Sequence, residues 1–92
     1  MNIFTRTITD KNGNHLYLTS KEFDLFYFLY SYRGQVFTKE QLLDHIWGYE
    51  YIGDTRTVDV HIKRLREKIK DNPGWSIATV WGIGYKFEVK NR

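Results

Sequence analysis

Apolar residues recur at helical spacing in three segments of this chain, and short β-prone segments lie before and after them. The first segment places four large side chains on or beside one helix face: Leu25, Phe26, Leu29 and Tyr32. Thr19 and Glu22 have the spacing of a capping box, in which each side chain accepts a hydrogen bond from the other's backbone N–H. Gly34 is the residue type that commonly follows a helix end. The pattern predicts a helix that begins after Thr19 and ends before Gly34.

A second capping box, Thr38 with Gln41, predicts another helix only a few residues later. Its apolar stripe is short and consists of Leu42, Leu43, Ile46 and Trp47. Gly48 stands where a left-handed residue would be needed after the helix. Residues 35–37 are expected to be short and extended, so the two helices must cross rather than run on. This is the sequence outline of a helix-turn-helix relative.

The third helical segment contains a clean buried stripe. Its spacing is i, i+4, i+7 and i+11, and its members are Val58, Ile62, Leu65 and Ile69. Asp54 or Thr55 is expected to cap the N-terminus. Residues 71–74, which include a proline and a glycine, are typical of a helix end.

β-prone segments stand at both ends of the chain. Thr7–Asp10 and Asn14–Leu18 flank an Asn-Gly turn and predict a hairpin, with Ile3–Thr5 as a candidate partner strand. Trp75–Val80 and Tyr85–Val89 predict a second hairpin, with two glycines in its connection. Strands, three helices and a final hairpin predict an α+β fold of the winged-helix kind.

Composition narrows the class of protein. The 92 residues allow one compact domain, which we assign to residues 1–92. Cysteine is absent, which excludes disulfides and thiolate zinc sites. No apolar run approaches the roughly 20 residues of a membrane span, and the N-terminus lacks a signal-peptide pattern. We therefore expect a cytoplasmic protein without membrane contact.

Positive charge is concentrated in the third helix. Between Arg56 and Lys70 there are six cations and two carboxylates, a balance of +4, whereas the whole chain carries +3. The other residues therefore sum to −1. Such a concentration is the footprint expected of a protein that binds a polyanion. A solvated helix face is the alternative that the charge count leaves open.

The outward side of this helix favours DNA over a merely solvated face. A second stripe lies roughly 90° round from the buried one and consists of Thr57, His61, Arg64 and Lys68, flanked by Arg56 and Val60. Arg64 can bind guanine O6 and N7 with two hydrogen bonds, and the methyl groups of Val60 can pack on a thymine methyl. A helix also fits the major groove, which is about 12 Å wide. The segment predicts a helix that reads duplex DNA, with the final hairpin beside it.

Five motifs occur in order along the chain: Leu-Thr-Ser-Lys-Glu at 18–22, Trp-Gly at 47–48, Arg-Thr-Val-Asp-Val-His-Ile at 56–62, Leu-Arg-Glu-Lys at 65–68, and Thr-Val with Gly-Ile-Gly-Tyr-Lys-Phe within 79–87. Together they resemble the effector domain of OmpR/PhoB-type response regulators over essentially the whole chain. The resemblance implies an N-terminal antiparallel sheet, usually of four strands, a three-helix core and a C-terminal β-hairpin wing. It implies sequence-specific binding of double-stranded DNA by a bacterial transcription factor of a two-component phosphorelay.

The resemblance also implies partners. Such proteins carry a receiver domain that is phosphorylated on aspartate. This implies a cognate sensor histidine kinase as a partner. The receiver domain is absent from this sequence, so we expect the chain to be a C-terminal fragment, with the first strand of the sheet cut away. Relatives suggest tandem half-sites bound by two copies, which implies a dimer on DNA.

Residue roles follow from the resemblance by position. The positions that resemble phosphate contacts are Arg56, His61, Lys63 and Arg66, and the stripe described above adds Lys68. The positions that resemble base contacts are Thr57, Val60 and Arg64. The backbone contacts expected from the second helix and the wing are Trp47, Thr79 and Tyr85. The loop that touches RNA polymerase in relatives corresponds to Gly48, Tyr49, Glu50, Tyr51, Ile52, Gly53 and Asp54.

Trp81 departs from the family pattern. Many members have an arginine there that enters the minor groove, and tryptophan lacks that charge. Three alternatives follow for Trp81 as a DNA contact: it stacks on sugars, wedges against the backbone, or stays out of the groove.

Other residues have a structural alternative beside the functional one. Trp47 is expected to be partly core, with its indole N–H left for a phosphate. His61 taken alone would be an ordinary surface histidine, and its place in the second stripe favours contact. Arg66 lies on the other side of the buried stripe, where an ion pair with Asp59 or Glu22 is the alternative.

Rival functions find less support. The three histidines are scattered, and metal-ligand spacing, a phosphate-binding glycine loop and an activated nucleophile are all missing, so we expect no enzyme, metal or cofactor. The aromatic pattern of an RNA-recognition sheet is missing. A protein-interaction module that uses residues 48–54 or the wing stays open, because relatives combine both activities.

Overall fold

The computed structural model describes residues 7–9, 13, 15–48, 54–69 and 74–90. Its elements in chain order are β1 (Thr7–Thr9), β2 (His15–Tyr17), α1 (Ser20–Ser31), β3 (Phe37–Thr38), α2 (Lys39–Trp47), α3 (Arg56–Ile69), β4 (Trp75–Val80) and β5 (Gly84–Val89). The predicted α+β class is confirmed, because these ranges hold three helices between two antiparallel hairpins.

The described strands form two separate sheets. β1 and β2 pair antiparallel, with Ile8 opposite Leu16, and confirm the predicted N-terminal hairpin. The second sheet has the order β3-β5-β4, in which Phe37 pairs with Tyr85 at the edge of the C-terminal hairpin. The extended stretch predicted between the first two helices thus ends in a strand of the wing sheet. The candidate strand Ile3–Thr5 lies outside the described residues, which hold two of the four N-terminal strands that the resemblance implies.

Both predicted capping boxes are present. Thr19 N–H donates to Glu22 Oε1 at 3.0 Å, and Glu22 N–H donates to Thr19 Oγ1 at 3.3 Å. Thr38 and Gln41 exchange the equivalent bonds at 2.8 and 3.0 Å. These bonds satisfy N–H groups that have no partner inside the helix, which explains why α1 and α2 begin where they do.

Tyr32 corrects the sequence prediction. It was expected on the buried face of the first helix, but it is 52% exposed. The physical reason is that α1 ends at Ser31, so Tyr32 is the C-cap and its backbone (φ −115°, ψ 40°) has left the helix. Its ring packs against Phe28 and Phe37 at the rim of the core instead. Gly34 then turns the chain with φ +89°.

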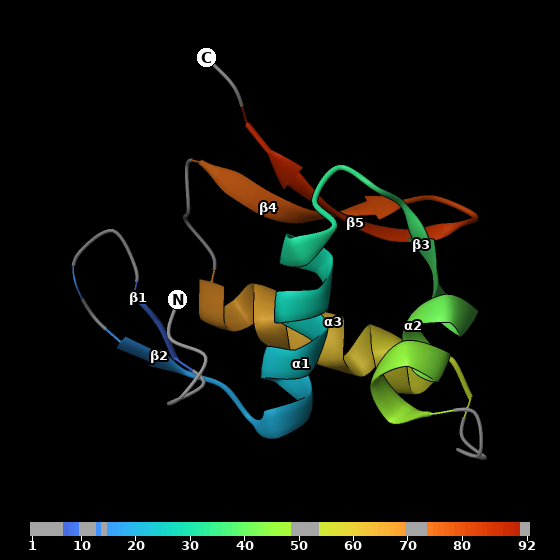
Figure 1. Cartoon of the computed structure of the whole chain (residues 1–92), viewed down its shortest axis with the longest axis horizontal. Helices are drawn as coiled ribbons and strands as arrows, with labels where there is room; N and C mark the ends of the chain where they lie inside the picture. Colours follow the sequence, from blue (N-terminus) through green and yellow to red (C-terminus); the bar gives the residue numbers. More distant parts are fainter. Residues whose placement is uncertain (1–6, 10–12, 14, 49–53, 70–73, 91–92) are drawn as a thin grey trace.

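The core lies where α1 crosses α3, with the wing sheet alongside and β5 packed against α1 (Figure 1). Its buried apolar residues from the helices are Phe23, Leu25, Phe26, Leu29, Leu42, Val58, Ile62, Leu65 and Ile69. Phe26 meets Phe87 of β5 edge-on, with ring centroids 5.8 Å apart. All four residues of the predicted α3 stripe are buried, so the opposite side of α3 is fixed toward solvent.

Candidate nucleic-acid interface

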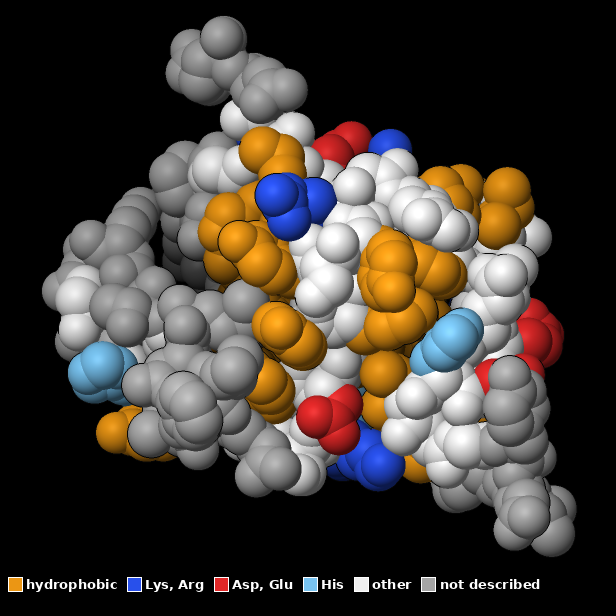
Figure 2. All heavy atoms as spheres, in the orientation of Figure 1, with side chains coloured by type: hydrophobic (Ala, Val, Ile, Leu, Met, Phe, Trp, Pro, Cys, Tyr) orange, Lys and Arg blue, Asp and Glu red, His pale blue; other side chains and the backbone are white. Residues whose placement is uncertain are grey.

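The outer side of α3 carries exposed cations beside an exposed apolar residue. Val60 is 43% exposed, and Lys63 and Arg64 are exposed. Among the described residues, neither Lys63 nor Arg64 has an ion-pair or hydrogen-bond partner for its side chain. The face that α1 presents in Figure 2 shows patches of hydrophobic side chains and only separate Lys and Arg side chains, so its described residues form no basic cluster.

Arg56 is held by its neighbour at the start of α3. Its Nε and Nη2 atoms donate to Asp54 Oδ2 at 2.9 and 2.7 Å, and its backbone N–H donates to Asp54 Oδ1 at 2.9 Å. The hydrogen bonds from Arg56 lower the pKa of Asp54, and the Asp54 carboxylate raises the pKa of Arg56. Of the two predicted caps, Asp54 therefore makes the side-chain contact. The pair is exposed, so the guanidinium can be shared with a phosphate.

His61 and Trp47 meet where α2 ends beside α3. Their rings are perpendicular, with centroids 4.9 Å apart, and Trp47 is half-buried as expected. His61 Nδ1 lies 2.8 Å from the carbonyl oxygen of Thr57. A carbonyl oxygen only accepts hydrogen bonds, so Nδ1 carries the proton and Nε2 is the nitrogen left for an outside partner. Lys21 adds a cation 5.9 Å from the Trp47 ring.

Lys68 makes contacts within the fold, although its spacing in the sequence predicted a place on the outward stripe of α3. Its Nζ lies 2.5 Å from Glu22 Oε1 and 3.3 Å from the carbonyl oxygen of Tyr17. Glu22 is only 2% exposed. Burial would raise the pKa of Glu22, but hydrogen bonds from Lys68 and Thr19 outweigh burial and lower it. The ammonium group of Lys68 thus compensates a buried carboxylate and ties α3 to α1.

Arg66 also points inward, to partners other than those expected. Its Nε and Nη2 atoms donate to the carbonyl oxygen of Ile77 at 3.0 and 2.8 Å, and Nη2 donates to Thr79 Oγ1 at 2.7 Å. The structural alternative for Arg66, an ion pair with Asp59 or Glu22, is not the contact that forms, because β4 runs along this flank of α3 and offers two acceptors. Two residues expected to contact DNA separately, Arg66 and Thr79, are bonded to each other.

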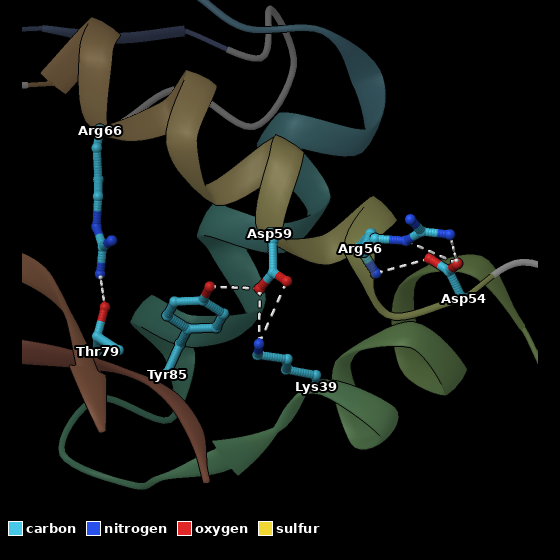
Figure 3. A network of polar contacts seen from close by, with 7 residues as sticks. All are labelled: Lys39, Asp54, Arg56, Asp59, Arg66, Thr79 and Tyr85. Carbon is cyan, nitrogen blue, oxygen red and sulfur yellow. Dashed lines mark hydrogen bonds and ion pairs between the residues drawn. The ribbon is translucent and has the colours of Figure 1, made fainter. Parts of the chain in front are cut away.

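Tyr85 is buried at the base of the wing, with 7% of its surface exposed. Its O–H donates to Asp59 Oδ1 at 2.5 Å, and Lys39 Nζ lies 3.2 Å from both oxygens of that carboxylate (Figure 3). Burial, together with the hydrogen bond to Asp59, raises the pKa of Tyr85 to about 12. Lys39 was not among the residues predicted from the sequence. The sequence offered one signal for this cluster: Asp59 and Arg66 lie seven residues apart and therefore share one flank of α3.

A groove of about 560 Å³ is lined by this flank of α3 and by the wing. Residues from α2, α3 and the hairpin line it, including Lys39, Asp59, Arg66, Thr79, Trp81 and Tyr85. The turn Trp81–Ile83 lines one end of the groove and is exposed, with Gly82 at φ +79°. Trp81 is 88% exposed, so its indole has not collapsed onto the core.

The predicted residues thus fall into three groups. Six lie on α3 toward its outer side or its N-terminal end: Arg56, Thr57, Val60, His61, Lys63 and Arg64. Four make contacts within the fold: Arg66, Lys68, Thr79 and Tyr85. Trp47 belongs with the first group because its ring contacts that of His61. Trp81, at the wing tip, forms the third group by itself. Of the predicted polymerase loop, residues 49–53 lie outside the described part of the chain.

The described ranges lack two other kinds of site. They contain no group of three or more His, Cys, Asp or Glu side chains that could hold a metal ion. No helix in them is long and apolar enough to cross a membrane.

Comparison with known proteins identifies the family. Residues 13–87 match the family described as transcriptional regulatory protein, C terminal. The chain belongs to this family, the OmpR/PhoB-type effector domains. Its function class is therefore that of the DNA-binding effector domain of a response regulator. It is 58% identical over 71 residues to the transcriptional regulatory protein YclJ of Bacillus subtilis, a match that covers 77% of this chain and 31% of YclJ. The chain spans about a third of the length of the curated relatives it matches.

Solved structures confirm the winged-helix fold of this effector domain. The DNA-binding domain of Bacillus subtilis CssR superposes with a TM-score of 0.84 at 37% identity, covering 94% of each chain. The RstA DNA-binding domain of Klebsiella pneumoniae, solved in complex with the RstA box, gives a TM-score of 0.78 at 34% identity, covering 95% of this chain and 87% of that one.

Proposed function

We propose that this domain binds duplex DNA sequence-specifically through the outer side of α3, and that the longer protein controls transcription in a two-component system. The observation that carries the proposal is the pair of exposed cations, Lys63 and Arg64, which have no partner among the described residues and are held outward by a fully buried stripe on the opposite side. A cation that is free of ion pairs, on a helix that the core holds rigid, is preorganised for an anionic ligand.

The proposed docking inserts α3 into the major groove. Its 14 residues span about 21 Å at 1.5 Å per residue, and its width fits the groove. Arg64, Thr57 and Val60 face base edges. Phosphates are contacted by Lys63, Arg56 and His61, which donates to a phosphate oxygen only when Nε2 carries a proton as well as Nδ1. Trp47 and the wing, with Thr79 and Trp81, approach the backbone on either side.

The wider proposal concerns the longer protein. Two copies bind tandem half-sites as a dimer on DNA, and residues 48–54 contact RNA polymerase. A receiver domain outside this chain is phosphorylated by a cognate sensor histidine kinase. The protein works in the cytoplasm, without catalytic activity of its own or a cofactor. The similar RstA DNA-binding domain, solved on its RstA box, supports the DNA part of this proposal.

A salt titration tests the proposal. If three to five phosphates are neutralised per copy, log K for a duplex should fall against log[salt] with a slope between about −3 and −4.5. A selection from a random duplex pool would supply the preferred site, and a scrambled duplex is the control for specificity. No binding to any duplex, or binding that does not change with salt, would reject the proposal.

A further inference from the structure

The wing is fastened to α3 at Ile77, whose carbonyl oxygen accepts from Arg66, and at one cross-strand pair nearer the turn. Thr79 on β4 and Tyr85 on β5 stand opposite each other in the hairpin. Arg66 donates to Thr79 at 2.7 Å, and Asp59 accepts from Tyr85 at 2.5 Å (Figure 3). Arg66 and Asp59 lie two turns apart on the same flank of α3. Two bonds from one helix therefore hold the hairpin just before its turn.

Asp59 joins a third element to this attachment. Lys39 at the start of α2 lies 3.2 Å from both oxygens of its carboxylate. The phenol of Tyr85, whose pKa is raised above the ordinary value of 10.0, is protonated at neutral pH, so its O–H is a donor to Asp59. One carboxylate on α3 thus connects α2 and β5.

The backbone beside this pair has no room for a side chain at Gly84. Gly84, the residue before Tyr85, pairs with Thr38 of β3 and with Val80 of β4. A Cβ at Gly84 would lie 1.9 Å from the carbonyl oxygen of Phe37, so β3 packs directly against the glycine backbone. Beyond this point the turn projects into solvent and carries the exposed Trp81. The attachment therefore determines where the wing tip stands relative to α3.

We propose that Asp59 is a positioning residue for DNA binding: with Lys39 and Tyr85 it sets the distance and angle between α3 and the wing, so that both meet one duplex together. The inference rests on the proposed function. A wing free to swing would have to be ordered during binding, and that ordering weakens affinity. Asp59 does not itself contact DNA. Tyr85 holds the wing to Asp59 and does not donate a hydrogen bond to a DNA phosphate.

The first test measures duplex affinity of the 92-residue chain at a temperature where melting curves show every variant fully folded. Asp59→Ala and Tyr85→Phe should each weaken binding roughly tenfold, as expected for one lost hydrogen bond to a charged group. The double variant should be no weaker than Asp59→Ala, because the contact that Tyr85→Phe removes is one of the two that Asp59→Ala removes. Asp59→Asn should stay within about threefold of the wild type, since its amide oxygen still accepts from Tyr85. Asp24→Asn, on the exposed face of α1, is the matched control and should bind like the wild type.

A hydroxyl-radical footprint separates positioning from general weakening. In Asp59→Ala the protections made by the wing should fade while those made by α3 persist. A folded Asp59→Ala protein with wild-type affinity would overturn the inference. So would a weaker complex that retains both sets of protections in their original proportion.

Amide hydrogen exchange tests the attachment without DNA. Exchange over residues 79–85 should be faster, by roughly tenfold, in Asp59→Ala than in Asp24→Asn, because opening of the wing becomes easier. Unchanged exchange would overturn the attachment even if DNA binding were normal. Failure of the wild type to bind any duplex would instead reject the proposed function and leave the exchange result to decide the role of Asp59 in holding the wing.

Discussion

Lys63 and Arg64 differ from Arg66 and Lys68 in their surroundings, although all four lie within two turns of α3. The first two are exposed and have no partner in the described part of the chain. The second two bond to β4 and to the buried Glu22. The comparison shows that a basic segment can divide its charge between an outside ligand and the fold. A count of cations therefore overstates the number available to DNA.

The largest expected effect concerns the stability of the inner pair. Lys68→Ala leaves the buried carboxylate of Glu22 without its cation and should lower the free energy of unfolding by about 2–3 kcal/mol. This is below the roughly 3–5 kcal/mol for breaking a fully buried pair, because Lys68 is partly exposed. Lys63→Ala is the control and should change stability by less than about 0.5 kcal/mol. Urea unfolding of both variants measures the difference, and equal stabilities would remove the distinction between inner and outer cations.

Arg64→Ala should have the next largest effect, and on DNA binding rather than stability. Loss of two hydrogen bonds to one base should cost about 1–3 kcal/mol on the preferred site and relax specificity at a single position. Affinities for a set of duplexes with one base pair changed at a time provide the measurement. If Arg64→Ala weakens every duplex equally, the base contact is wrongly assigned.

Lys63→Ala should act more weakly and without regard to sequence. Removing one phosphate contact should reduce the magnitude of the salt slope by about one unit for all duplexes. Lys68→Ala, measured where it is folded, should leave the slope unchanged because Lys68 is occupied by Glu22. A lower slope in Lys68→Ala would show that the inner cation also reaches DNA.

The smallest expected effect is a pH dependence of stability from the inner pair. The pKa of Glu22 is lowered in the folded chain, so its carboxylate stabilises the fold above its unfolded pKa. That contribution should be lost as the pH falls from the ordinary pKa of 4.5 toward and through the folded pKa of Glu22. Unfolding between about pH 6 and pH 3 should therefore show a steeper loss in the wild type than in Glu22→Gln. Parallel pH curves for the two proteins would contradict the role given to Glu22.

Local patterns predicted the elements well for a physical reason. A capping box joins residues three apart, and a buried helix stripe repeats every three or four residues, so both are visible in a short window. Both capping boxes formed as predicted, at Thr19 with Glu22 and at Thr38 with Gln41. The buried stripe of α3 that begins at Val58 also formed as predicted. The prediction that Tyr32 is buried was wrong, because helical spacing does not say at which residue the helix ends.

Contacts between distant residues were beyond such patterns. Arg66 meets Ile77 because β4 runs back along α3, and Lys68 meets Glu22 across 46 positions. Asp59 meets Lys39 and Tyr85, which come from two other elements. Each of these partners depends on how helices and sheet pack, and several acceptors in the sequence would have satisfied the same donor equally well.

The basic helix, its buried side and its place before a glycine-bearing hairpin follow from residue order, because periodicity and turn chemistry act over a few neighbours. Which of its cations stay free is a matter of packing. A guanidinium or ammonium bonds the acceptor that the fold brings within about 3 Å, and no local pattern specifies that neighbour.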